Sequence, residues 1–215
     1  MERLVCLLIG YIFGLFQTGY FYGKTQGVDI RKMGSGNAGS TNALRTMGIK
    51  AGMITLLGDC FKCVIAVLVV RGIYGQSHAD ILPLLSLYTG FGAVLGHNFP
   101  FYLKFKGGKG IACIIGVSLV AAPVVTLIAF AAGLIFIILF KIGALGSFII
   151  ILVPNLYEAA VIGASDPAVC ALIFAIVALA FFAHRSNLVR MFTGTENRTV
   201  LFGKKKKKNG EDKKA

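Results

Sequence analysis

The amino-acid sequence predicts an all-α membrane protein, and three observations support this prediction. Hydrophobic residues make up 56% of the 215 residues and charged residues only 14%, whereas a soluble domain carries about 25% charged residues. The mean hydropathy is +0.79. Apolar runs of about 20 residues, the length that crosses a bilayer, recur from end to end. A water-soluble single domain is therefore not expected.

The apolar runs define the expected membrane spans. Five of them are clear, at residues 4 to 22, 50 to 70, 81 to 97, 146 to 163 and 167 to 183. The stretch from 110 to 140 is too long for one span, because its roughly 31 residues would form a helix of about 46 Å across a core of about 30 Å. It is too short for two full spans. Pro123 marks the expected break, since proline removes a backbone donor and clashes with the preceding turn.

The placement of basic residues predicts the sidedness, because short loops rich in Lys and Arg stay in the cytoplasm. If 110 to 140 crosses twice, one side of the membrane holds all but three of the 22 Lys and Arg residues, the exceptions being Arg3, Lys62 and Arg71. If it crosses once, Lys141 and the tail fall opposite the first two basic loops. We therefore expect seven transmembrane helices, one of them short, with the N-terminus outside and the C-terminus in the cytoplasm.

The sequence predicts one transmembrane domain followed by a basic tail. Residues 1–198 form the expected single transmembrane domain, and its first apolar segment has no cleavage site and should stay attached. Residues 199–215 are expected to be a basic disordered tail. Its lysines, Lys204 to Lys208 with Lys213 and Lys214, have no apolar residues among them to fold around and are expected to lie beside anionic lipid. A basic surface beside a membrane makes nucleic acid a remote partner.

The five cysteines do not indicate a disulfide framework or a metal site. All of them fall inside apolar runs, where they act as small hydrophobes. Cys60 and Cys63 form a CxxC, but no second Cys or His pair stands nearby to complete a zinc site. We expect no metal and no cofactor.

The first of three polar segments covers residues 34–45. Its three glycines permit tight turns and offer backbone N–H groups to an anion, and further donors come from the side chains of Ser35, Asn37, Ser40, Thr41, Asn42 and Arg45. The segment also matches the GxGxxG dinucleotide-binding pattern, with Asp59 twenty residues after its last glycine. That alternative fails on context, because Asp59 lies in an apolar helical span rather than in a βαβ unit.

The second polar segment covers residues 96–110 and ends on Gly107, Gly108, Lys109 and Gly110. These residues open the next helix, where free N–H groups, the positive helix end and a lysine would converge on a phosphate. Ile111 occupies the Ser/Thr position of a Walker A loop, so ATP is not implied. The alternative is a flexible loop with solvated lysines.

The third polar segment covers residues 184–196, directly after the last span. His184 and Asn187 are three residues apart and share a helix face. Arg185 and Arg190 belong to the same segment, and the alternative is that they only anchor the helix end at the headgroups.

Isolated polar residues within the spans are also informative. Asp59 and Lys62 are expected to pair in a site that excludes water. Asn155 and Glu158 have the same spacing near the outer surface, where solvation suffices to explain them. Ser147 lies on the cytoplasmic side and is a candidate to line the site.

In chain order, the motifs read GSGNxGxTNxxR, DxxK, GHxFPxxxxFKGGKG and HRxNxxR…GxE. The sequence from residue 29 to 196 thereby resembles the bacterial integral-membrane acyl-phosphate:glycerol-3-phosphate acyltransferases. The resemblance implies seven helices, an acyl phosphate donor, glycerol 3-phosphate as acceptor and lysophosphatidic acid as product. It also implies the first acylation step of phospholipid synthesis, in the bacterial inner membrane with the active site on the cytoplasmic face.

The sequence departs from the family pattern at three positions. Leu15 and Gln17 stand where the family has Ser and Pro, and Ala144 stands where a serine is expected. The first departure concerns the shape of the first helix, and the second concerns one polar contact. The phosphate-binding segments are unaffected.

The chemistry indicated by the residues agrees with the resemblance. The His-x-x-x-x-Asp pattern of an acyl-CoA acyltransferase is absent, and so is the G-x-S-x-G elbow of an acyl-enzyme serine. A phosphate has a second pKa of about 6 and can itself accept a proton. The protein would then position two phosphate-bearing substrates, and the acyl phosphate would help to deprotonate the attacking hydroxyl.

Two groups of residues are predicted to bind the substrates. The acyl phosphate is assigned to Ser35, Thr41, Gly107, Gly108 and Lys109. Glycerol 3-phosphate is assigned to Arg45, Lys104, His184 and Asn187, with Ser147 as a weaker addition. The residues predicted to act in catalysis are Ser35, Arg45, Lys104, His184 and Asn187. His97 suits either a base or structural hydrogen bonding. The alternative function is a phosphate-ester transporter, which would need polar groups along a path to the other face.

The expected topology places the C-terminus and the 97 to 110 loop on the same side. Cysteines introduced as Lys106→Cys and Lys205→Cys should therefore react with a membrane-impermeant thiol reagent from the same side of right-side-out vesicles. Opposite accessibility of the two positions would contradict the seven-span topology.

Overall fold

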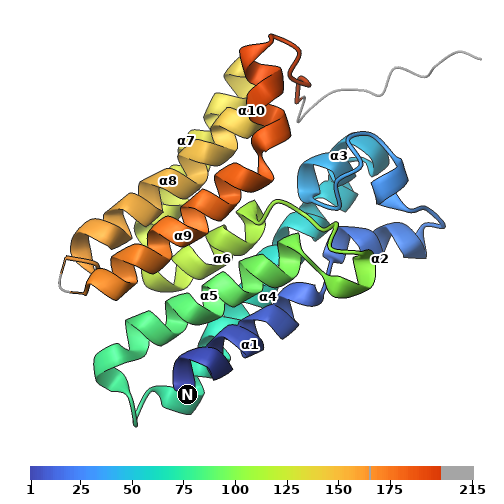
Figure 1. Ribbon diagram of the computed structural model, residues 1–215. Coiled ribbons are helices and arrows are strands. Elements are labelled where there is room, and N and C mark those ends of the chain that lie inside the picture. The colour runs from blue at the N-terminus through green and yellow to red at the C-terminus, as the bar shows by residue number, and fades with distance from the viewer. Residues whose placement is uncertain (165, 200–215) are drawn as a thin grey trace, which may run out of the picture.

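The computed structural model describes residues 1–164 and 166–199, so the predicted basic tail lies outside the described residues except for its first residue. Every regular element in the described part is a helix (Figure 1), which confirms the all-α prediction. The α-helices are α1 (Glu2–Leu15), α2 (Thr18–Thr25), α3 (Ser40–Met47), α4 (Ile49–Tyr74), α5 (Leu82–Asn98), α6 (Ile111–Ala121), α7 (Pro123–Phe140), α8 (Gly143–Val161), α9 (Pro167–Ala183) and α10 (Arg185–Phe192). Three single-turn 3-10 helices are η1 (Ile30–Lys32), η2 (Ala79–Ile81) and η3 (Phe101–Leu103).

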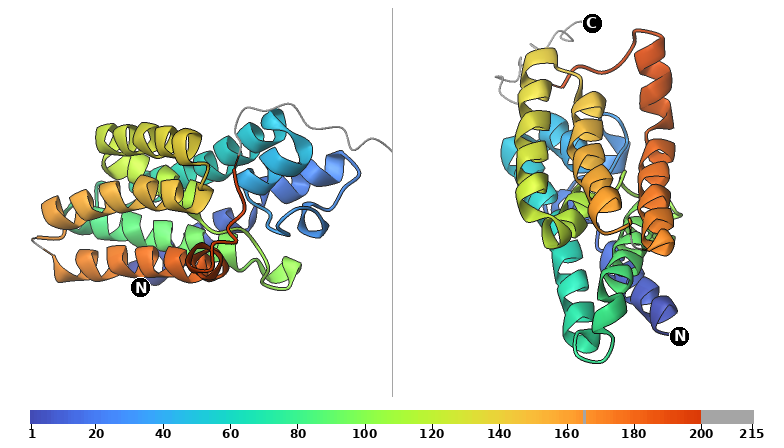
Figure 2. Two further views of the ribbon diagram at one scale, coloured as in Figure 1. Left: turned by 90° about the horizontal axis from the view of Figure 1, so that it is seen from above. Right: turned by 90° about the vertical axis from the view of Figure 1, so that its left-hand side faces the viewer.

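Five segments are long and apolar enough to cross a membrane, namely Glu2–Thr25, Ile49–Tyr74, Ala79–Leu103, Pro123–Phe140 and Gly143–Val161. A sixth results if α9 and α10, which meet at an angle of 59°, are counted as one span. The long helices run in roughly the same direction, and α2 and α3 lie together at one end of the bundle (Figure 2).

The stretch from 110 to 140 breaks where proline was expected to break it. The helix α6 ends at Ala121, and α7 begins at Pro123. Seven of the 11 residues of α6 are buried, and the helix packs against α4, α5, α7 and α8. This packing shields the short helix from lipid, against which unsatisfied backbone groups are not tolerated.

The first apolar segment does not form the uninterrupted span expected at 4 to 22. It breaks after Leu15 and resumes as α2 at Thr18. Gln17 at the break is buried, and its side-chain amide donates to the carbonyl oxygens of Gly14 at 3.3 Å and His97 at 3.0 Å. Although the serine and proline of the family are missing, this glutamine ties the break to the end of α5.

The helices α1 and α5 run side by side (Figure 1) and approach closely through glycine. A Cβ atom on Gly92 would collide with the carbonyl oxygen of Leu7, and one on Gly96 would collide with that of Tyr11. On the side of α1, a Cβ atom on Gly14 would collide with the carbonyl oxygen of Ala93 in α5. Small residues are the usual means by which membrane helices pack backbone against backbone.

The expectation that Asn155 and Glu158 are solvated is wrong. Their exposed fractions are 2% and 1%, because α8 turns this face into the bundle. The amide of Asn155 donates to the carbonyl oxygen of Ile151 at 2.8 Å.

Adding one methyl group at the interface between α1 and α5 should destabilise the protein. Gly92→Ala places a Cβ atom against backbone, which cannot move aside, and such overpacking costs about 1–3 kcal/mol. Gly72→Ala is the matched control, since its Cβ atom would meet nothing within 4 Å and alanine favours the helix by about 0.5–1 kcal/mol. Thermal unfolding in one detergent should rank Gly92→Ala below wild type and Gly72→Ala at or above it. Equal melting temperatures for the two variants would refute the close packing.

Candidate active site

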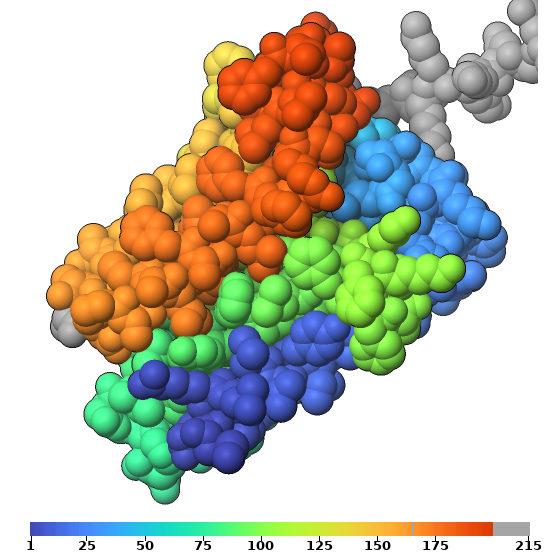
Figure 3. Space-filling view, viewed as in Figure 1, coloured from blue at the N-terminus to red at the C-terminus, as the bar shows by residue number. Residues whose placement is uncertain are grey.

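The three polar segments meet around one cavity of about 300 Å³. Its wall combines residues 35–37, residues 105–109 and a group from the C-terminal segment, namely Phe182, Ala183, Arg185, Ser186 and Arg190. In Figure 3 the C-terminal segment, the loop after α5 and the segment before α3 border one another on one face of the molecule. The structure therefore brings together three segments that the sequence keeps about 60 residues or more apart.

The first polar segment folds around the side chain of Asn42. This residue is 2% exposed, and its Oδ1 accepts a hydrogen bond from the backbone N–H of Ser35 at 2.9 Å. Its Nδ2 lies within hydrogen-bonding distance of three carbonyl oxygens, those of Ile30, Met33 and Asn37. Asn42 thus points inward and shapes the loop, so the prediction that it offers a donor to an anion is wrong.

The first and second polar segments contact each other directly. Asn37 accepts a hydrogen bond from the N–H of Gly39 at 2.9 Å and donates its own amide to the carbonyl oxygen of Gly107 at 3.4 Å. Gly34 and Gly36 have φ angles of 56° and 72°, the left-handed region that favours glycine. The tight turn leaves Ser35 and Gly36 at the surface of the cavity.

The glycine loop of the second segment is folded back onto the end of α5. The N–H groups of Gly107 and Gly108 donate to the carbonyl oxygens of Asn98 at 3.1 Å and His97 at 3.0 Å. Their N–H groups are therefore not free for an anion, in contrast to what the sequence suggested. A Cβ atom on Gly108 would collide with the His97 ring, and one on Gly107 would collide with the His97 carbonyl oxygen. Only glycine at both positions lets the loop lie this close to the end of α5.

The donors that remain for an anion lie one step further along the chain. The helix α6 begins at Ile111, and the backbone N–H groups of its first turn have no carbonyl partner within the helix. They add to the positive end of the helix dipole. Lys109 stands just before this turn, on the wall of the cavity. Of the residues predicted to bind an anion, Gly107, Gly108 and Lys109 line the cavity, whereas no residue of α6 is on its wall.

Asp59 and Lys62 form the predicted ion pair, at 2.9 Å and fully inside the bundle. Besides Asp59, the ammonium of Lys62 contacts the carbonyl oxygens of Gly14 at 3.2 Å and Phe16 at 2.5 Å. Its Nζ also lies 3.0 Å from Nδ1 of His97. Since an ammonium has only donors, Nδ1 accepts, and the other ring nitrogen faces Gly108.

This arrangement decides between the two interpretations of His97. The ring is 2% exposed and is not part of the cavity wall. One nitrogen is occupied by Lys62, and the other is covered by Gly108. His97 is a structural link between α4, α5 and the glycine loop.

On the other side of the cavity, Lys109 and the C-terminal segment form a chain of polar contacts. Lys109 Nζ donates to Oδ1 of Asn187, and Asn187 Nδ2 donates to Oε1 of Glu196 at 2.8 Å. Arg190 Nε donates to the second oxygen of the same carboxylate at 3.1 Å. Burial and the nearby positive charges of Arg190 and Arg45 lower the pKa of Lys109 to about 8, although Glu196 opposes this shift. An anion in the cavity would relieve the excess of positive charge.

The other predicted residues do not line the cavity. His184 is 3% exposed, and its Nδ1 lies 2.9 Å from the carbonyl oxygen of Ala180. Thr41 and Arg45 are exposed on α3, and Lys104 is exposed beside the glycine loop. The Ser147 hydroxyl donates to the Gly143 carbonyl oxygen at 2.9 Å within α8.

Sequence reasoning gave no role to several residues that do line the cavity. These are Asn98, Arg185, Ser186 and Arg190. The arginines were interpreted as possible headgroup anchors, but the structure turns Arg190 towards Glu196 and the cavity. The sequence did contain one indication of a role for these arginines, because they belong to the same short segment as His184 and Asn187.

Comparison with known proteins gives a consistent result. A family model described as glycerol-3-phosphate acyltransferase matches residues 4–194. The chain belongs to this family. A glycerol-3-phosphate acyltransferase from Thermoanaerobacter sp. (strain X514) is 39% identical over 199 residues, which is 92% of this chain and 96% of that protein. The corresponding enzyme of Geobacter sulfurreducens is 38% identical over 198 residues, covering 92% of this chain and 98% of that one.

A solved structure shares both fold and sequence. The crystal structure of PlsY (YgiH), an integral membrane glycerol 3-phosphate acyltransferase in its glycerol 3-phosphate form, has a TM-score of 0.79 and 32% identity. The likeness covers 94% of this chain and 96% of that one. This member of the glycerol-3-phosphate acyltransferase family is therefore a multi-pass integral membrane enzyme, and the polar cavity is its candidate active site.

The buried pair of Asp59 and Lys62 generates a prediction about stability. Asp59→Asn leaves a buried ammonium without its counter-charge, which costs about 3–5 kcal/mol. The double variant Asp59→Asn with Lys62→Met contains no buried charge, so it should unfold at a higher temperature than Asp59→Asn alone. Thermal unfolding in one detergent measures both.

The matched control is Asp29→Asn, which removes a partly exposed ion pair with Arg31 and should cost at most about 1 kcal/mol. Lys62→Met alone completes the comparison. If the double variant instead loses as much stability as Asp59→Asn and Lys62→Met lose when their separate losses are added, the charges of Asp59 and Lys62 are not coupled.

Proposed function

We propose that this family member transfers an acyl chain from acyl phosphate to glycerol 3-phosphate, giving lysophosphatidic acid and phosphate. This reaction is the first acylation step of phospholipid synthesis. The glycerol 3-phosphate part follows from the family and from solved relatives described in glycerol 3-phosphate and lysophosphatidic acid forms. The composition of the cavity wall supports acyl phosphate as the donor. Among the described residues, its wall carries Lys106, Lys109, Arg185 and Arg190 but no Asp, Glu or His.

A cavity with this wall suits anions and lacks a protein base. Three acid or imidazole groups discussed above do not line the cavity: Glu196 binds Asn187 and Arg190, His97 binds Lys62, and His184 directs its Nδ1 to the Ala180 carbonyl oxygen. The hydroxyls of Ser35 and Ser186 on the wall have no carboxylate or imidazole beside them in the cavity. An acyl-enzyme intermediate on serine therefore has no activating group.

An acyl phosphate supplies what the protein does not. In the proposed step, a glycerol hydroxyl oxygen attacks the acyl carbonyl carbon, and the bond from that carbon to the phosphate oxygen breaks. The electron pair leaves with the phosphate, and the hydroxyl proton passes to a phosphate oxygen, whose conjugate acid has a pKa of about 6. The protein contributes by orienting the two substrates and by stabilising the departing phosphate, which supplies several kcal/mol.

We assign the two phosphates to two adjoining groups of residues. The acyl phosphate binds at Lys109 and the start of α6, over Gly107 and Gly108 and next to Ser35, with Thr41 nearby. Glycerol 3-phosphate binds Arg45, Lys104, His184 and Asn187, with Ser147 as a weaker addition. The contact between Lys109 and Asn187 joins the two groups and supports this assignment.

We further propose seven membrane crossings, with the active site on the cytoplasmic face of a bacterial inner membrane. The N-terminus is then outside, the C-terminus is cytoplasmic, and residues 199–215 form a separate basic element at the membrane surface. Two observations support this topology. The helices α1 and α5 run parallel, and α6, although short, is buried between other helices. No residue lines both this cavity and the second one at the other end of the bundle, which disfavours a transporter path through the described residues.

Two substitutions should separate the phosphate sites. Arg45→Lys keeps the charge but loses the planar fork that binds two phosphate oxygens, so the KM for glycerol 3-phosphate should rise far more than that for acyl phosphate. Lys109→Ala should raise the KM for acyl phosphate and also lower kcat, because that phosphate is the proposed proton acceptor. Steady-state kinetics with each substrate varied in turn measures both effects.

Lys50→Ala is the matched control for a lost exposed charge at the same end of the bundle, and thermal unfolding checks that each variant is folded. Equal effects of Arg45→Lys and Lys109→Ala on both substrates would contradict the assignment of two sites.

The lowered pKa of Lys109 gives a pH dependence. Its ammonium is charged below about pH 8 and loses its proton as the pH rises through that value. An anion binds the charged form, so kcat/KM for acyl phosphate should fall above about pH 8. Lys109→Arg keeps the charge to a pH above about 12, and its profile should show no such fall near pH 8. A fall that persists unchanged in Lys109→Arg would assign the titration to another group.

A further inference from the structure

A second cavity lies at the end of the bundle opposite the glycine-rich loops. It has a volume of about 90 Å³ and is formed by α4, α5, α6, α8 and α9. It is large enough for a small polar group, since a water molecule takes up about 30 Å³ of the liquid. None of its residues belongs to the active-site cavity, and the reaction proposed above does not use it.

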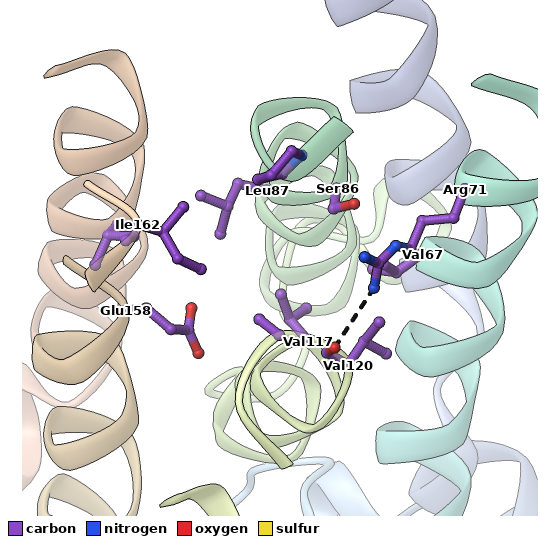
Figure 4. Close-up of a pocket in the computed structure, with 11 residues that line it drawn as sticks. Val67, Arg71, Ser86, Leu87, Val117, Val120, Glu158 and Ile162 are labelled. Atoms are coloured by element: carbon purple, nitrogen blue, oxygen red, sulfur yellow. Dashed lines mark hydrogen bonds between the residues drawn. The ribbon is translucent and has the colours of Figure 1, made fainter. Parts of the chain in front are cut away.

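Glu158 points into this cavity from α8 (Figure 4). The residue is 1% exposed, and Oε1 of its carboxyl group has no hydrogen-bond partner among the described residues. Asn155 precedes it by one helical turn but donates its amide to the carbonyl oxygen of Ile151 instead. The Ser118 side chain is a hydrogen-bond partner of the carboxyl group, so Oε1 is the atom left unsatisfied. A buried oxygen without a partner is costly, and its orientation towards a cavity indicates that the missing partner is a bound group.

Arg71 reaches the same cavity from the opposite wall (Figure 4). It lies in the last turn of α4 and is exposed, as expected for a basic residue at headgroup level. One guanidinium nitrogen donates to the carbonyl oxygen of Val120 at 3.5 Å, which holds the side chain at the rim. The cavity separates Arg71 from Glu158, so a cation lies at the rim and a carboxyl group, which can carry its negative charge once a cation lies against it, lies at the floor.

The walls between these two charges are mostly apolar. Val67, Leu87 and Val117 provide aliphatic surface, and Ser86 adds a hydroxyl. A ligand that fits must therefore carry an anionic group near the membrane surface, a short apolar linker, and a cationic donor at the buried end.

We propose that this cavity binds the headgroup of a zwitterionic phospholipid that carries a primary ammonium. Its phosphate contacts Arg71 at the rim, and its ammonium donates hydrogen bonds to the Glu158 carboxylate at the floor. A trimethylated ammonium is bulkier and has no N–H to donate, and a glycerol headgroup offers no cation to the Glu158 carboxyl group. Phosphate joined to an ethylammonium group is the common headgroup chemistry that matches both the rim and the floor of the cavity.

The test is lipid retention by the purified full-length protein in detergent. Native mass spectrometry is performed with equal amounts of phosphatidylethanolamine, phosphatidylcholine and phosphatidylglycerol of the same acyl chains. Phosphatidylethanolamine should be retained about tenfold more than the other two, which is the effect of one charge-assisted contact. Glu158→Gln should abolish this preference, and Arg71→Ala should reduce the retention of all three lipids.

Two control variants remove charges at the same end of the bundle without touching the cavity. Asp80→Asn is matched to Glu158→Gln, and Arg3→Ala is matched to Arg71→Ala, since both control residues are exposed and neither lines the cavity. Both controls should keep the preference of the wild-type protein.

Three results would overturn the proposal. The first is equal retention of the three lipids by the wild-type protein, which needs no variant to fold. The second is an undiminished preference in Glu158→Gln. The third is a protein that shows no lipid preference but is stabilised against heat by sodium chloride and not by choline chloride. This stabilisation would have to disappear in Glu158→Gln. This last result would assign the cavity to an inorganic cation.

Discussion

One buried ammonium determines how the active-site end of the bundle is arranged. A helix that breaks inside a membrane exposes carbonyl oxygens that lipid cannot satisfy, and the first span breaks between α1 and α2. Lys62 contacts two of these oxygens while it pairs with Asp59 and binds the His97 ring. The break, the middle of α4 and the end of α5 are thereby held together. The glycine loop rests on the same histidine, so the position of the candidate site depends on this contact.

The geometry that follows explains why the loop contains so many glycines. The loop runs so close to the end of α5 that any side chain at Gly107 or Gly108 would collide with His97. Their N–H groups satisfy the last carbonyls of α5, and the Lys109 ammonium on the cavity wall is left for an anion. Positive charge therefore collects at the cavity without a neutralising carboxylate on its wall. Such a site suits chemistry in which the substrate carries its own base.

Much of this arrangement could be predicted from the sequence, and the failures have physical causes. Hydropathy and the position of Pro123 predicted α6 and α7, and the spacing of Asp59 and Lys62 predicted their pair, because these depend on neighbours along the chain. The inward turn of Asn42, the hydrogen bonds that occupy the glycine N–H groups and the burial of Glu158 depend on partners from distant segments. A sequence pattern indicates that a polar residue is present, but only packing decides which way it points.

The central claim is that the substrate, rather than the protein, supplies the leaving group and the base. The most direct test is an assay of the purified protein with glycerol 3-phosphate and either acyl phosphate or acyl-CoA of the same chain length, with lysophosphatidic acid as the measured product. Product should form with acyl phosphate alone, with release of one phosphate for each lysophosphatidic acid. Formation of lysophosphatidic acid from acyl-CoA at a comparable rate would contradict the account.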